Sequence, residues 1–189
     1  LMVEWAILLA LAIAAALYAQ TSDWTARIDN QLLDFGSSLT RPPLDPDITL
    51  VTIDDESLAQ IGVWPWSRDR HAQLIDQLER DGARLIVLDI LFPEPSESGA
   101  DEALAQAVER SGKVVLPHSF VARRNSVDAI DPLWPLPALR AASAGVGHVD
   151  AAPDPDGGLR RFDLSFRTLD DAFPHAAVRA LEASGADTS

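Results

Sequence analysis

Short runs of consecutive apolar residues alternate with amphipathic stretches through the middle of the chain. The apolar runs are residues 48–53, 84–89 and 113–116, and acidic residues close the first two. Between them, residues 67–82 and 101–112 place apolar side chains at helical spacing, and each stretch ends at a glycine. Near-continuous apolar strands alternating with helices are typical of parallel sheets with right-handed crossovers. The pattern predicts an α/β fold with a mainly parallel sheet and flanking helices.

The C-terminal third has a different pattern. Residues 145–149 are short and apolar, residues 154–158 form a turn signal, and residues 159–166 alternate apolar with charged side chains. Such alternation predicts a half-buried strand, so we expect an antiparallel hairpin here. Phe173 and Pro174 then open a last helix, because proline is favoured in the first turn of a helix.

The N-terminal segment is apolar, and Glu4 is its one charged residue. This run, over residues 1–20, approaches the length of about 20 residues that crosses a bilayer, so we expect a transmembrane helix whose start lies upstream. Helical spacing of apolar residues predicts a juxtamembrane helix over residues 21–40. Prolines make residues 41–46 an extended linker, which opens a globular domain over residues 41–189.

The composition narrows the range of functions. The formal net charge is −14 at pH 7, which opposes binding to nucleic-acid phosphates, so we expect no nucleic-acid partner. The chain contains no cysteine, which excludes disulfides, thiolate metal sites and cysteine nucleophiles. It also carries neither a Gly-x-Ser-x-Gly elbow nor a phosphate-binding glycine loop after the first strand, so we predict no catalytic residue and no cofactor.

Three aspartates, Asp54, Asp55 and Asp89, follow two of the predicted strands. Ligands collect at the carboxyl ends of strands in an open parallel sheet, so these carboxylates are expected to lie together. They could bind a hard cation, with Asp54 and Asp89 as the candidate metal ligands. The alternative is structural: one aspartate caps the helix that begins at Glu56, and another accepts hydrogen bonds from the backbone or from Arg68.

Histidines, indoles and arginines complete the predicted polar cluster. The histidines could add nitrogen ligands to a metal site, or each could be a satisfied polar residue that tethers a loop. The two tryptophans and the following arginine could bind a ligand by stacking and ion pairing, or could form a loop that closes the open end of the sheet. The full predicted cluster, ligand-binding or structural, is Asp54, Asp55, Trp64, Trp66, Arg68, His71, Asp89, His148 and Arg161.

Several segments together carry a family resemblance. They are VTIDDESL at residues 51–58, WPWSR at 64–68 with His71, GARLIVLDILF at 82–92, GVGHV at 145–149 and DPDGGLRR at 154–161. In this order and spacing they resemble the CHASE domain of the second type. That is an extracytoplasmic sensory module fused to bacterial adenylate cyclases, histidine kinases, serine/threonine kinases and cyclic-dinucleotide enzymes.

The resemblance implies signal input at the periplasmic or outer face of the bacterial inner membrane, with no catalysis by the chain itself. The resemblance also implies that a small molecule or ion is the signal. The protein would be a homodimer anchored in the membrane by its N-terminal helix, and the flanking membrane helices would pass the signal to an output domain. Two alternatives stay open. One is a dimerisation module without a ligand, whose mark is an exposed apolar face on the juxtamembrane helix. The other is a metal-dependent hydrolase-like enzyme.

Overall fold

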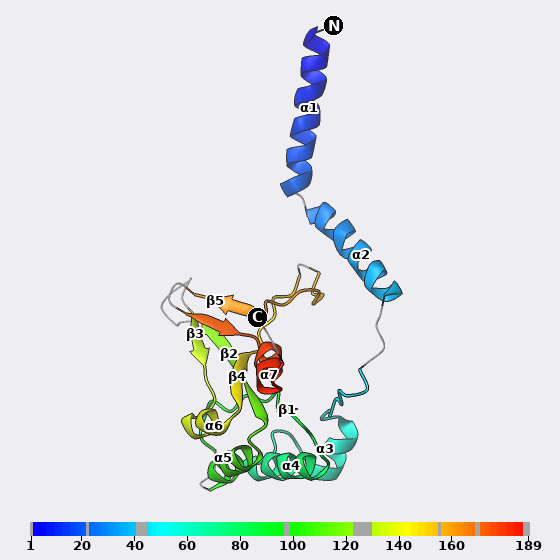
Figure 1. Cartoon of the computed structure of the whole chain (residues 1–189). Coiled ribbons are helices and arrows are strands. Elements are labelled where there is room, and N and C mark those ends of the chain that lie inside the picture. Colours follow the sequence, from blue (N-terminus) through cyan, green and yellow to red (C-terminus); the bar gives the residue numbers. More distant parts are fainter. Residues whose placement is uncertain are drawn as a thin grey trace. The chain divides into compact units, whose positions relative to one another are not determined.

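The computed structural model describes residues 2–21, 23–40, 45–96, 99–122, 130–154, 156–168 and 171–186. The chain divides into two units, Leu1–Ile53 and Asp54–Ser189, and each is described by itself. Figure 1 shows the order of the elements. The second unit contains the sheet and the helices that pack on it.

The first unit contains two helices, α1 (Met2–Thr21) and α2 (Asp23–Leu39) (Figure 1). The sequence predicts a membrane span over residues 1–20, and a helix does form there. Among the residues that the structure describes, however, no helix is both long enough and apolar enough to cross a membrane. Helix α2 is the predicted second helix, and residues 41–44 of the predicted linker lie outside the described residues.

The predicted first strand, residues 48–53, does not form. The segment has no regular secondary structure, and Ile48 and Leu50 are 75% and 84% exposed. A β-branched run fits a pleated surface, but it becomes a strand only where a neighbouring strand takes up its backbone hydrogen bonds. In the described chain this segment is not paired with any strand.

The sheet of the second unit is built around β2 (Val114–Ala122). Strands β1 (Ile86–Val87) and β4 (Gly145–His148) pair with it in parallel, and β3 (Ile130–Leu133) pairs with it antiparallel. The α/β class and the parallel sheet are therefore confirmed. The second and third predicted strands correspond to β1 and β2.

Helices α4 (Arg68–Arg80) and α5 (Ala100–Ser111) form where the sequence predicts them and lie side by side (Figure 1). Gly112 takes a left-handed conformation with φ 62° and ends α5, as glycine does at helix C-termini. The core joins the two helices to the sheet through Ile75, Leu104, Val108 and Leu116, all fully buried. The short helices α3 (Asp55–Ile61) and α6 (Pro137–Ala142) complete this part.

The C-terminal antiparallel hairpin exists, but its strands differ from the predicted ones. It consists of β5 (Ser165–Arg167) and β6 (Ala172–Pro174), whereas β4 pairs with β2. The alternating residues 159–164 do not form a strand. The last helix, α7 (Ala176–Ala183), begins after His175, so Pro174 ends β6 and does not open the helix.

Candidate functional site

Asp54 has the structural role that the sequence left as an alternative. It is the N-cap of α3, and its Oδ1 accepts hydrogen bonds from the backbone nitrogen and the hydroxyl of Ser57, at 2.9 and 2.7 Å. The hydrogen bonds to Ser57 lower the pKa of the Asp54 carboxyl below its usual value. Asp55 is the first residue of the same helix. Negative charge is favourable at this end of a helix.

Arg68 does not pair with the aspartates that the sequence placed around it. Its Nε lies 3.3 Å from Oδ1 of Asp101, its Nη2 donates to the Glu94 carbonyl, and its guanidinium lies over the ring of Phe92. These partners come from α5 and from the loop before it, which are far from Arg68 in sequence. No ion pair joins Asp54, Asp55 or Asp89 to another described residue.

Trp64, Trp66 and His71 pack together as an aromatic group. The Trp64 ring lies 5.7 Å from that of Trp66 and 5.6 Å from that of His71, which in turn contacts Phe92. His71 is fully buried, and that burial lowers the pKa of its imidazole. The three rings therefore pack on one another and on Phe92, while Trp64 stays exposed.

The structure holds no grouping that fits the predicted metal ligands. In the described ranges, no three histidine, cysteine or acidic side chains come together as a metal site would require. Asp89 is exposed and follows β1 in a segment without regular structure. The predicted cluster at the strand ends is therefore divided among separate local interactions.

His148 belongs to a second, buried group that the sequence reasoning found only in part. The register of β2 and β4 places His118 directly opposite His148, and the ring of His175 lies 5.0 Å from that of His148. The rings of Phe120 and Phe173 pack against His118. Neither ring nitrogen of His148 has a hydrogen-bond partner among the described residues. Burial, aided by the neighbouring His175, lowers the pKa of His148, and burial likewise lowers that of His118.

Arg161 is exposed and lies 3.9 Å from Asp154. Its neighbour Arg160 makes the shorter contacts, at 2.9 Å to Asp154 and 2.8 Å to Asp156. The two arginines therefore differ: Arg160 turns inward onto the acidic turn and Arg161 lies outward. Both follow the turn at residues 154–158, in which hydrogen bonds join Asp154 to Gly157 and Gly158.

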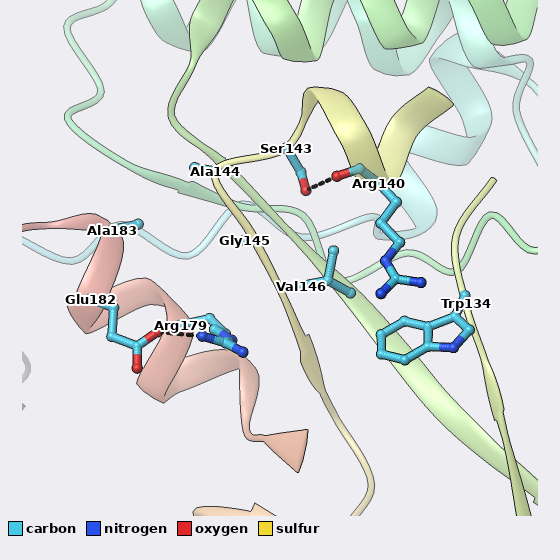
Figure 2. A pocket seen from close by; sticks show the side chains of 9 residues that line it. All are labelled: Trp134, Arg140, Ser143, Ala144, Gly145, Val146, Arg179, Glu182 and Ala183. Carbon is cyan, nitrogen blue, oxygen red and sulfur yellow. Dashed lines mark hydrogen bonds and ion pairs between the residues drawn. The ribbon is translucent and has the colours of Figure 1, made fainter. Parts of the chain in front are cut away.

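A hollow of about 430 Å³ lies between α6, β4 and α7, and we call it the arginine hollow. Trp134, Arg140, Val146, Arg179 and Glu182 are among the residues that line it. In Figure 2 the strand that carries Gly145 and Val146 runs between Arg179, which pairs with Glu182, and the side chains of Arg140 and Trp134. The hollow therefore presents two cations and one carboxylate.

Each arginine of the hollow is held in a distinct way. The Arg140 guanidinium carbon lies 4.0 Å from the centre of the Trp134 ring, a cation–π contact that fixes its direction. Nη1 of Arg179 lies 2.8 Å from Oε2 of Glu182, and its Nε is enclosed without a hydrogen-bond partner among the described residues. Arginine groups fixed in this way are suited to binding carboxylate or phosphate oxygens.

Comparison with known proteins identifies the family. The family model of the CHASE2 domain matches residues 7–188, which is nearly the whole chain. This chain belongs to the CHASE2 family. Neither a curated protein nor a solved structure matches it. CHASE2 domains are extracytoplasmic sensory domains of signalling proteins, so the resemblance found in the sequence is confirmed.

In this CHASE2 domain, sequence reasoning missed the arginine hollow entirely. Trp134 and Arg140 lie more than thirty residues before Arg179, and no motif joins them. The sequence contains one indication of the hollow, the predicted strand at residues 145–149. This strand is β4, which lies between α6 and α7 and lines the hollow. The sequence places His118 just after the apolar run 113–116. It does not show that His118 lies opposite His148, because that pairing depends on the register of the two strands.

Proposed function

We propose that this CHASE2 domain is the extracytoplasmic signal-input domain of a membrane-bound bacterial receptor. It would control an output enzyme such as an adenylate cyclase, a kinase or a cyclic-dinucleotide enzyme. The observation that carries the proposal is the family match over residues 7–188. Because the domain senses, its own residues would bind a signal and change shape, and they would not convert a substrate.

The position of the arginine hollow fits this role. Arg179 and Glu182 lie on α7, the last helix that the structure describes, and Arg140 lies on α6. A ligand that touches both helices binds best to one arrangement of them, so it would favour that arrangement over others. Binding in the hollow can thus be passed along the chain as a shift of α7.

Cysteine labelling in intact cells tests the location. The chain has no cysteine, so one introduced residue reports on one position. Gln106 is exposed on α5 and its neighbour Ala107 is fully buried, which makes Gln106→Cys the probe and Ala107→Cys the matched control. A membrane-impermeant maleimide should label Gln106→Cys in intact cells as strongly as in lysed cells, and should leave Ala107→Cys unlabelled. Labelling that requires lysis would place the domain inside the cell and reject the proposal.

A second candidate function, dimerisation without a ligand, is favoured by the surface of α2. Ile28, Leu32, Phe35 and Leu39 recur at helical spacing on this helix, and all four are exposed. An unpaired apolar stripe of this kind is typical of a helix that packs against a second copy of itself.

Sedimentation of the full chain tests this candidate. Leu32→Glu puts a charge on the stripe, whereas Gln31→Glu makes a similar change at an exposed position beside it. If α2 is the dimer contact, Leu32→Glu is monomeric at concentrations at which the unchanged chain and Gln31→Glu are dimers. A chain that sediments as a monomer at every concentration would exclude the dimerisation module.

A further inference from the structure

We infer that the arginine hollow binds a small organic oxyanion, meaning a carboxylate or a phosphate ester attached to an apolar group. The inference rests on the proposed sensory role, and it names the chemical class of the signal. It concerns residues outside the cluster predicted from the sequence, because none of Asp54, Asp89 or His148 lines the hollow.

The charges of the hollow favour an anion. Arg140 forms no ion pair with any acidic residue in the described part of the chain, and its guanidinium lies on Trp134. Glu182 offsets the charge of Arg179, with which it pairs at 2.8 Å. One positive charge therefore remains beside the hollow, and guanidinium groups bind carboxylate and phosphate oxygens through paired hydrogen bonds.

The side chains of both arginines are also held in place before any ligand binds. Contact with Trp134 restrains Arg140, and the ion pair with Glu182 restrains Arg179. Less side-chain freedom is then lost when an anion binds, which strengthens binding. Arg140 and Arg179 line the same hollow, with β4 running between them in Figure 2, so each can offer a charged donor to an anion bound there.

The surroundings provide a place for an apolar group. Trp134 and Arg140 also line a second hollow of about 580 Å³, whose other walls include Pro93, Pro135, Leu136 and Pro137. Both volumes lie in the range of small-molecule sites, about 300–1,000 Å³. A ligand with its oxyanion at the arginines can therefore extend its apolar part along Trp134 into the proline-lined hollow.

The negative net charge of the chain means that anion binding needs a specific site. At −14, the long-range field repels anions and weakens nonspecific anion binding. Anion binding to this protein therefore requires a local arrangement of cations. Arg70 provides a matched control, because it carries the same charge but lies on α4 and does not line either hollow.

Titration calorimetry on the full chain tests the inference with four sodium salts at constant ionic strength: benzoate, phenyl phosphate, acetate and inorganic phosphate. Benzoate, phenyl phosphate or both should bind, and more tightly than acetate and inorganic phosphate, which lack the apolar group. The tighter of the two aromatic anions identifies the preferred head group. Arg140→Gln should raise the Kd about tenfold or more, and Arg179→Gln should do the same, because each removes a charged hydrogen-bond donor.

Arg70→Gln should leave the Kd unchanged. Arg140 is exposed, so its variant is expected to fold, and an unchanged circular dichroism spectrum checks this for all three variants. The inference is overturned if neither aromatic anion binds, if acetate binds as tightly as benzoate, or if Arg70→Gln weakens binding as much as Arg140→Gln. These outcomes leave the cysteine-labelling test of the extracytoplasmic location unaffected.

Discussion

The buried histidines His118 and His148 link the stability of the domain to pH. Burial is the main reason why the pKa of each imidazole is lower than its ordinary value of 6.5. The charge of Asp150 acts in the opposite direction on the pKa of both imidazoles, as does that of Asp163 on the pKa of His148, while His148 and Arg140 add to the lowering at His118 and His175 adds to it at His148. A histidine whose pKa falls on folding binds its proton more tightly in the unfolded chain. Its contribution to stability is complete above pH 6.5 and is lost as the pH falls through the folded-state value.

We therefore expect the free energy of unfolding to decrease as the pH is lowered from about 7.5 to 5.5. Replacing His148 with leucine removes one titrating group, so the decrease should be smaller by about 1.4 kcal/mol for each unit by which folding lowers its pKa. Urea denaturation at several pH values measures this. A His148→Leu variant with the same pH dependence as the unchanged chain would show that His148 does not titrate on unfolding.

Gly147 allows α7 to approach the sheet. A Cβ at this position would lie 2.6 Å from the Cα and the nitrogen of Ala176, the first residue of α7. A Cβ at Gly145, two residues earlier in β4, would meet only Arg179 at an ordinary 3.5 Å. The close contact at Gly147 involves backbone atoms, which cannot turn aside as a side chain can.

Gly147→Ala should therefore lower the free energy of unfolding by about 1–3 kcal/mol, the usual cost of overpacking. Gly145→Ala should change it little. Equilibrium urea denaturation of the two variants makes the comparison. Equal stability of both variants would mean that β4 and α7 are not as close as the structure places them.

At the scale of elements, the helices of the core were predictable because their signals are local. Apolar side chains at helical spacing and a glycine at each C-terminal end were enough to locate α4 and α5. The strands were less predictable, because pairing is not local. Residues 48–53 and Ile86–Val87 belong to similar apolar runs, yet only the second run finds a neighbouring strand. The hairpin was expected across the turn at residues 154–158, between residues 145–149 and 159–166, but forms where residues 165–167 and 172–174 meet.

The difference between local and non-local interactions also explains which parts of the candidate site could be predicted. The capping role of Asp54 was among the predicted alternatives, because a cap depends on residues three positions away. The partner of Arg68, Asp101, was not predicted, because that ion pair depends on how α4 packs against α5. The arginine hollow depends on three elements that meet only in the folded chain.

The packing of α5 gives a prediction at this scale. Leu104 is fully buried in the core, whereas Gln106 on the same helix is exposed. Leu104→Ala should lower the free energy of unfolding by about 2–5 kcal/mol, because it removes buried apolar contacts and leaves a cavity. Gln106→Ala should stay within about 0.5 kcal/mol of the unchanged chain. Chemical denaturation compares the two, and a cost for Leu104→Ala no larger than that for Gln106→Ala would contradict the position of the core.

At the scale of the whole molecule, the chain is a CHASE2 domain with a strongly acidic composition, and the arginine hollow is the site where we propose that an anion binds. A sensor needs a ligand to bind one of two arrangements more tightly. The arginine hollow can meet this requirement because α6, β4 and α7 each contribute to it. If the proposed receptor function holds, the binding of benzoate or phenyl phosphate is coupled to the activity of its output enzyme.

The most direct measurement is the output activity of the proposed membrane-bound receptor, with and without the aromatic anion that binds the purified chain. The activity should change at concentrations that saturate the hollow. The change should persist in Arg70→Gln and require more anion, by about the same factor as the rise in Kd, in Arg140→Gln. An output rate that stays constant while the anion saturates the hollow would contradict the sensory account.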